Sequence, residues 1–170
     1  MIAVIPVKMS VRLPGKHLMA ICGKDLLSIV LEKVARVFDP VIYSKVDLPF
    51  DYIIDTSENI VQLVSRLSRI YPDGFALIGG DMPFFTVDDL NILLSSFKGI
   101  TVVPRHMDGA MEPLFAIYHG KLAASSSLIQ SIENSPYHGI PAEKFSKYAF
   151  FNVNTEDDLE LANEICDGLV

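Results

Sequence analysis

The chain has 170 residues, of which 50% are hydrophobic and 21% are charged, so it is too apolar for a disordered protein and long enough to bury one core. We therefore expect a single domain over residues 1–170. The net charge of −7 argues against a nucleic-acid partner, because binding a polyanion requires many Lys and Arg side chains to neutralise its phosphates.

The chain also lacks the features of membrane and secreted proteins. No apolar run approaches the ~20 residues of a membrane span, and residues 1–11 lack the basic start and cleavage site of a signal peptide. We therefore predict a cytoplasmic protein with no membrane partner. Cys22 and Cys166 are too few for a dense disulfide framework, and the four histidines are scattered, so a structural zinc site is not expected.

Strand and helix patterns alternate along the chain. Residues 2–6 form a short β-branched run typical of a buried strand, and residues 26–38 carry apolar side chains at helical spacing behind Asp25, a good helix cap. Thr86 with Asp89, and Thr155 with Asp158, predict two capping boxes. The same patterns predict further strands at 41–44, 52–55, 75–80, 100–104, 114–119 and 148–154, and helices at 58–71, 88–97, 121–134 and 158–166.

This alternation predicts an α/β fold, a single-domain Rossmann-like three-layer α/β/α sandwich with a mainly parallel central sheet. In such sheets the ligand lies beyond the carboxyl ends of the strands, where the strand order reverses. Three polar segments follow predicted strands: the loop after residues 2–6, the turn at Asp81, and the Asn-rich segment at 152–155. We expect the functional site there.

The loop after the first strand is basic. Residues 1–36 carry a net charge of +4, which leaves −11 for the rest of the chain. Arg12 and Lys16 flank Pro14 and Gly15, and a loop with cations and free backbone N–H groups suits a triphosphate. The spacing fits neither a Walker loop nor a dinucleotide fingerprint. The alternative is that these are ordinary solvated side chains near a terminus.

Asp81 is a lone carboxylate directly after the predicted strand at 75–80. Mg²⁺ is commonly held by one or two carboxylates together with substrate oxygens and water. The amide oxygen of Asn154 could complete such a metal shell without adding charge. The alternatives are that Asp81 caps a turn, although Thr86 already fills that role, and that Asn154 serves a turn for backbone reasons.

Four segments resemble known nucleotidyltransferases. Residues 10–18, SVRLPGKHL, with GKDLL at 23–27, are similar to the amino-terminal signature of nucleotide-sugar cytidylyltransferases. GDMPF at 80–84, EPLFAIY at 112–118 and NVNTEDDL at 152–159 resemble segments of the molybdenum cofactor guanylyltransferase-like (MobA-like) family. Both groups would have the nucleotide-diphospho-sugar transferase type of fold. Three segments against one favour the guanylyltransferase side.

The resemblance implies a Mg²⁺-dependent nucleotidyltransferase that moves a nucleoside monophosphate from an NTP, with GTP favoured, to a small phosphorylated acceptor and releases pyrophosphate. It implies Arg12, Lys16 and Asp81 as catalytic residues and Asp81 with Asn154 as metal ligands. Residues 106–108 lie where acceptor contacts are expected. Glu112 could bind an acceptor hydroxyl or a nearby water, and the alternative of a plain edge carboxylate is favoured. The implied nucleotide-binding residues are Pro6, Val7, Lys8, Arg12, Gly15, Lys16, Lys24, Asp55, Gly80 and Asp81.

Two positions depart from the family pattern. Pro6, Val7 and Lys8 stand where the family has a Gly-Gly pair. Residues 40–70 carry no family signature, and Asp55 and Ser57 are the candidate stand-ins for a second Gly-rich loop. The sequence leaves other functions open: a cytidylyltransferase making a CMP-sugar, a non-catalytic nucleotide-binding member, and an α/β interaction domain without a nucleotide site. A monomer or small homo-oligomer is expected.

Overall fold

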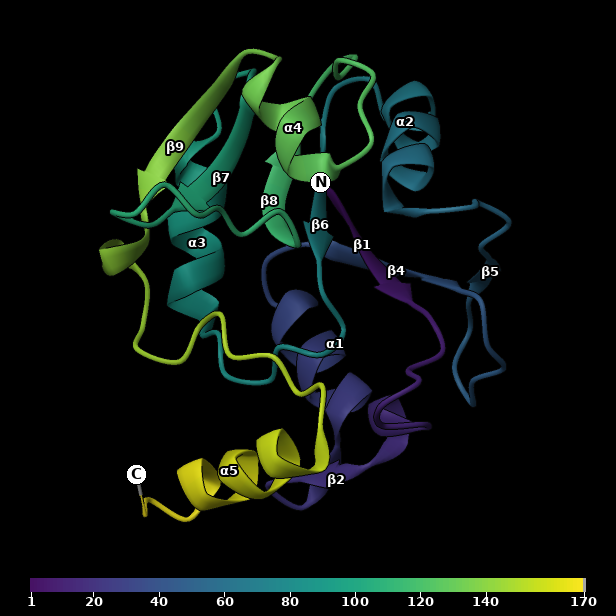
Figure 1. The fold of residues 1–170 in the computed structure, drawn as a ribbon, viewed down its shortest axis with the longest axis vertical. Helices are drawn as coiled ribbons and strands as arrows, with labels where there is room; N and C mark the ends of the chain where they lie inside the picture. The colour runs from purple at the N-terminus through teal and green to yellow at the C-terminus, as the bar shows by residue number, and fades with distance from the viewer. Residues whose placement is uncertain (170) are drawn as a thin grey trace.

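The computed structural model describes residues 1–169 and contains a seven-stranded sheet in the order β5-β4-β1-β6-β8-β7-β9 (Figure 1). Among the described strands of this sheet, only β8 runs antiparallel to its neighbours, β6 and β7. The mainly parallel sheet is thus confirmed. The strands are β1 (Ile2–Val7), β4 (Asp39–Ser44), β5 (Ile53–Ile54), β6 (Phe75–Ile78), β7 (Thr101–Arg105), β8 (Phe115–Tyr118) and β9 (Tyr137–Pro141).

β1 lies near the middle of the sheet because its apolar residues can be buried on both faces. Ala3, Val4 and Ile5 have no exposed surface. The strand pairs with β4 from Ile2 to Val7 and with β6 on its other side, where Ala3 lies opposite Ala76. A continuous apolar run rich in β-branched residues is typical of such a doubly covered strand.

Helices cover both faces of the sheet. One core cluster joins α1 (Leu26–Val34) and α3 (Val87–Ser96) to one face, and a second joins α2 (Ile60–Ile70) and α4 (Leu128–Glu133) to the other. The predicted three-layer α/β/α sandwich is therefore confirmed. In the described residues no helix is both long and apolar enough to span a membrane.

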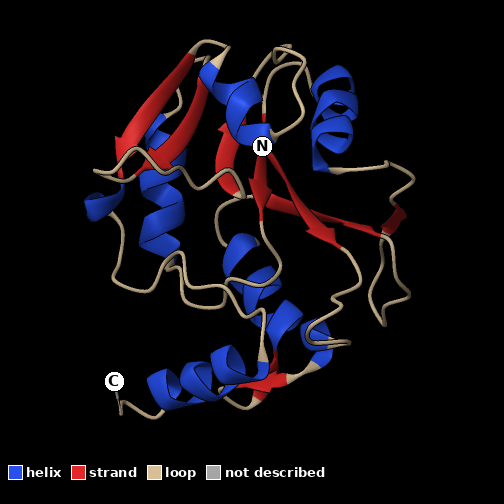
Figure 2. Cartoon of the chain, in the orientation of Figure 1, coloured by secondary structure: helices blue, strands red, loops and turns tan. Residues whose placement is uncertain are grey.

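A smaller layer lies beside the sandwich. It consists of the hairpin of β2 (Ala20–Ile21) and β3 (Lys24–Asp25) together with α5 (Glu156–Cys166), which Figure 2 shows side by side, away from the main sheet. We call it the α5 layer. A disulfide between Cys22 and Cys166 joins the hairpin to the end of α5, and the layer has its own apolar cluster, made of Leu13, Ile21, Leu26, Val153 and Ala162.

Three helix starts follow the predicted caps. Asp25 caps α1, as predicted. The side chain of Asn59 caps α2, which the sequence analysis did not predict. Both predicted capping boxes are present, Thr86 with Asp89 on α3 and Thr155 with Asp158 on α5. These contacts satisfy backbone N–H groups that have no partner inside the helix.

The predicted strand at 148–154 is wrong. This aromatic segment makes turns, with Phe151 N–H donating to Tyr148 O, and crosses the carboxyl edge of the sheet, where Val153 N–H donates to Asp81 O at 2.9 Å. Its apolar residues are buried because they divide between two clusters: Ala149 packs into the main core and Val153 into the α5 layer. A loop whose apolar residues are buried on both sides has the same apolar sequence pattern as a buried strand.

The last strand is instead β9, which the sequence did not predict. Its sequence, YHGIP, contains Gly and Pro, and only Ile140 is fully buried, because β9 is an edge strand paired on one side with β7. The predicted helix at 121–134 is confirmed only as the short α4. The preceding serines bond to side chains nearby, as when Ser125 Oγ donates to Gln130, rather than continuing the helix.

Candidate functional site

The order of the strands reverses between β1 and β6. The chain passes from β1 to β4 and β5 on one side, and then crosses back to β6 on the other side of β1. The loops after the two strands therefore leave the same edge of the sheet side by side. One is the basic loop, residues 8–19, and the other is Gly79–Gly80–Asp81.

Three predicted side chains meet at this edge. The Lys16 ammonium donates to Asp81 Oδ2 at 3.0 Å and to Asn154 Oδ1 at 3.0 Å. The side chains of Lys16 and Asp81 are only 9% and 18% exposed. Asp81 and Asn154, which lie 65 and 138 positions after Lys16 in the sequence, thus converge with it at one point. The basic loop and the lone acid therefore meet at the same edge of the sheet.

Local structure holds each of these three residues. Lys16 begins the short helix η1 (Lys16–Leu18), which follows Gly15 in a left-handed conformation with φ of 73° that favours glycine. Asn154 precedes the capping box of α5, and its N–H donates to Asp158 Oδ2 at 2.9 Å. The bond from Val153 N–H to Asp81 O ties the Asn154 segment to the Asp81 turn.

The two glycines before Asp81 leave room for the site. A Cβ on Gly79 would lie 3.0 Å from Asp81 Oδ1, and one on Gly80 would lie 3.3 Å from the ring of His17. Side chains at these positions would press on the carboxylate or on the imidazole. The pair is therefore required by close packing around Asp81.

His17, which the sequence analysis did not select, is buried against Gly80 and is 7% exposed. The pKa of His17 is lowered from 6.5 to about 4, mainly by burial. The charge of Lys16 contributes to this lowering, and that of Asp81 opposes it. The imidazole is therefore neutral at pH 7. Nothing in the spacing of the four histidines distinguishes this one, since only the fold buries it.

We expect this histidine to make the metal-free protein acid-sensitive. Because the folded pKa lies below the unfolded one, His17 takes up a proton on unfolding, and the stability it contributes above pH 6.5 is lost as pH falls towards 4. The loss should be on the order of 3 kcal/mol. Urea unfolding of the wild type and His17→Gln at several pH values measures it. The variant should have a flatter pH profile, and equal slopes would contradict the assignment.

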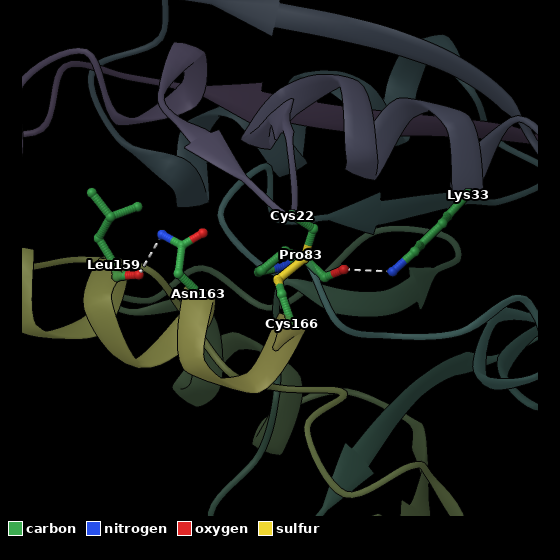
Figure 3. Close-up of a disulfide and its surroundings, with 6 residues drawn as sticks. All are labelled: Cys22, Lys33, Pro83, Leu159, Asn163 and Cys166. Atoms are coloured by element: carbon green, nitrogen blue, oxygen red, sulfur yellow. Dashed lines mark hydrogen bonds between the residues drawn. A yellow bond between two sulfur atoms is a disulfide. The ribbon is translucent and has the colours of Figure 1, made fainter. Parts of the chain in front are cut away.

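A second residue that the sequence did not reveal is Lys33, on α1. Its ammonium donates to the carbonyl of Pro83, two residues after Asp81 (Figure 3). The ammonium also lies 5.7 Å from the centre of the Phe85 ring. Burial lowers the pKa of Lys33, while the charge of Asp89 raises it. Lys33 thus positions the turn that carries Asp81. The Cys22–Cys166 disulfide lies in the same view.

The structure brings only part of the predicted nucleotide site together. Gly15, Lys16, Gly80 and Asp81 lie at the shared edge. Pro6 and Val7 end β1 just before the basic loop, in which Lys8 and Arg12 are exposed. Neither Lys8 nor Arg12 forms a salt bridge with the residues described.

Lys24 and Asp55 are not part of this cluster. The Lys24 ammonium is exposed and pairs with Glu32 at 2.8 Å, because the β2–β3 hairpin turns it towards α1. Asp55 follows the edge strand β5, where it accepts hydrogen bonds from Ser57 N–H and Oγ and lies 3.7 Å from the Lys45 ammonium. Asp55 therefore has a structural role in its own loop.

The oxygen atoms at the shared edge are suitable ligands for a divalent cation. Asp81 Oδ2 and Asn154 Oδ1 lie equally far from one nitrogen atom, and both are the hard oxygen ligands that Mg²⁺ prefers. Over residues 1–169 no group of three or more His, Cys, Asp or Glu side chains could hold a metal ion. A cation here would need further oxygens from substrate and water.

Comparison with known proteins fits this geometry. The chain is 30% identical over 174 residues to a protein of Pyrococcus furiosus named "Probable molybdenum cofactor guanylyltransferase", with 89% of this chain and 86% of that protein covered. The chain belongs to the molybdenum cofactor guanylyltransferase family. It is therefore a nucleotidyltransferase. A relative of the same name from Natranaerobius thermophilus is 26% identical, with 88% and 87% covered. No protein-family model matches the chain.

Solved structures share the fold of this guanylyltransferase family member. Rv0371c of Mycobacterium tuberculosis H37Rv superposes with a TM-score of 0.72 at 17% identity, covering 96% of this chain and 97% of that one. Its complex with manganese gives 0.69 at 16% identity, covering 96% and 98%. A cytidylyltransferase of Leptospira borgpetersenii gives 0.73 at 13% identity, covering 99% and 87%. At these identities the likeness supports the fold alone.

Proposed function

We propose that the chain is a Mg²⁺-dependent guanylyltransferase that moves GMP from GTP to a small phosphorylated acceptor, with release of pyrophosphate. The observation that carries the proposal is the convergence of Lys16, Asp81 and Asn154 beyond β1 and β6. The names of the two curated relatives favour the molybdenum cofactor as the acceptor.

The proposed reaction requires alignment and charge neutralisation more than covalent chemistry from the protein. A phosphate oxygen of the acceptor attacks the α-phosphorus of GTP, the bond from that phosphorus to the bridging oxygen breaks, and pyrophosphate leaves with the electron pair. Lys16 and Arg12 would bind the triphosphate and offset the charge that builds on the leaving group. The free backbone N–H groups of the basic loop would add donors.

Asp81 and Asn154 would hold the Mg²⁺ ion. When bound, the ion would neutralise phosphate charge and orient the triphosphate for in-line attack. The manganese complex of Rv0371c, which shares the fold, supports a divalent ion for this architecture. His17, which lies against Gly80, and Lys33, which donates to the Pro83 carbonyl, would keep the Asp81 turn in place.

The acceptor would bind at the same edge of the sheet, beyond the end of β7. Residues 105–112 leave the carboxyl end of β7, and His106 Nε2 lies 2.8 Å from Glu112 Oε1, which fixes the loop. The exposed guanidinium of Arg105 could bind an acceptor phosphate through two parallel hydrogen bonds, as a bidentate ligand. An open pocket of about 380 Å³ here is lined by Arg105, His106, Met107, Gly139, Pro141 and Glu143.

The test is a thermal-shift screen with each of the four NTPs and Mg²⁺, followed by a pyrophosphate-release assay with the molybdenum cofactor. Binding stabilises the folded state, by about 2.7 kcal/mol at a hundredfold excess of ligand over Kd. GTP should raise the melting temperature most. If none of the four nucleotides shifts it at millimolar concentration, the proposal fails.

The same screen decides the second candidate, a cytidylyltransferase. The resemblance of residues 10–18 to nucleotide-sugar cytidylyltransferases favours that function. A shift produced by CTP and not by GTP would select it. Binding of one nucleotide without turnover on any acceptor would instead indicate a non-catalytic member of the family.

A further inference from the structure

The Lys16 ammonium occupies the point between the two proposed metal ligands. Its nitrogen lies 3.0 Å from Asp81 Oδ2 and 3.0 Å from Asn154 Oδ1. An ammonium group has three hydrogen-bond donors and no acceptor, so it satisfies both oxygens in place of a metal ion. A divalent ion that used the same two oxygens would have to share this space with Lys16.

Charge makes such sharing unfavourable. In the free protein the single positive charge of Lys16 already balances the single negative charge of Asp81, and Asn154 adds none. A divalent ion entering beside the ammonium would gain one carboxylate and meet a like charge within a few ångströms. Both side chains are largely buried, so solvent screens this repulsion poorly.

A triphosphate would change this balance. It brings about four negative charges, which offer the ammonium a new partner and supply oxygens to a metal ion. The Lys16 ammonium stands on a flexible four-carbon stem, so it can turn towards a phosphate without a change in the backbone of the basic loop.

We infer that Lys16 acts as an internal counter-ion that keeps divalent metal out of the Asp81–Asn154 site until a triphosphate draws its ammonium away. Metal then enters together with the nucleotide or after it. The inference rests on the proposed function, because it uses the same two metal ligands. It adds an order of binding and a role for Lys16 in the free protein, besides its contact with phosphate.

The test measures Mn²⁺ binding to the full chain without nucleotide, by electron paramagnetic resonance or calorimetry. Lys16→Met keeps the length of the side chain and removes its charge. Because close charge pairs couple strongly, it should tighten Mn²⁺ binding by at least ~10-fold. Lys98→Met is the matched control, since Lys98 is exposed after α3, at the amino end of β7. It should leave Mn²⁺ affinity unchanged. Adding Asp81→Asn to Lys16→Met should abolish the gain.

Two results would overturn the inference in distinguishable ways. Equal Mn²⁺ affinity in the wild type and Lys16→Met, with weaker binding in Asp81→Asn, would leave the metal site intact and remove the counter-ion role. Mn²⁺ binding that no Asp81 substitution affects, with or without GTP, would remove the metal site and the proposed function with it. Because the readout is metal affinity, loss of phosphate contact in Lys16→Met does not enter it.

Discussion

Asp81→Asn is expected to lower the rate of metal-dependent pyrophosphate release by ~10²–10³-fold, the effect of losing one well-placed electrostatic contact to a reacting group. Asp81 is the only charged oxygen ligand among the three residues that meet at the site. Asparagine keeps the shape of the side chain, and its amide oxygen can still accept a hydrogen bond from Lys16. The fold should therefore remain, which circular dichroism and the melting temperature would show.

Asp73→Asn is the matched control for this substitution. Asp73 is exposed and precedes β6, whereas Asp81 follows it, so the two residues lie at opposite ends of the same strand. The control should retain wild-type turnover with GTP and Mg²⁺. Full activity of Asp81→Asn would exclude a role for Asp81 in metal binding, even if the protein still binds nucleotide.

Removing the Cys22–Cys166 disulfide is expected to lower the free energy of unfolding by roughly 3 to 5 kcal/mol and the melting temperature by roughly 10 °C. The bond joins residues 144 positions apart, so it restricts nearly the whole unfolded chain. It also holds the end of α5 against the hairpin, in a layer whose apolar cluster is small. Urea unfolding of Cys22→Ser/Cys166→Ser measures the loss.

A dithiol reductant provides the control for the disulfide experiment. Cys22 is exposed in the hairpin turn and is accessible to a reductant, so the reductant should destabilise the wild type and leave the double variant unchanged. Hydrogen exchange should quicken first in α5, which follows Asn154. An identical unfolding midpoint for oxidised and reduced wild type would contradict the expectation. Thiol titration of the purified protein checks that the bond is present.

Much of the fold could be predicted because short-range patterns report burial and capping. The run at residues 2–6 marks a strand covered on both faces, and β1 is that strand. Thr86 and Thr155 mark helix starts because their side chains bond to backbone within three residues. By contrast, residues 148–154 are buried by two separate clusters, and the aromatic pattern alone could not distinguish this from a strand.

The site shows the same division. Lys16, Asp81 and Asn154 could be chosen from sequence because each follows a glycine or asparagine-rich turn with a family resemblance. Lys24 also follows a glycine within a family-like segment, so the sequence could not distinguish it from Lys16. In the structure Lys24 pairs with Glu32, away from the site. His17 and Lys33 gave no signal, since their roles depend on contact with Gly80 and with the Pro83 carbonyl.

The sequence by itself determined the α/β class, the positions of most helices and strands, and three of the polar groups at the site, because these depend on local pattern and residue chemistry. Only the tertiary structure decided that a separate α5 layer exists, that a disulfide joins its two parts, and that an ammonium group lies between two proposed metal ligands. Each of these depends on distances between residues 65 to 144 positions apart. Such distances follow from how the layers pack.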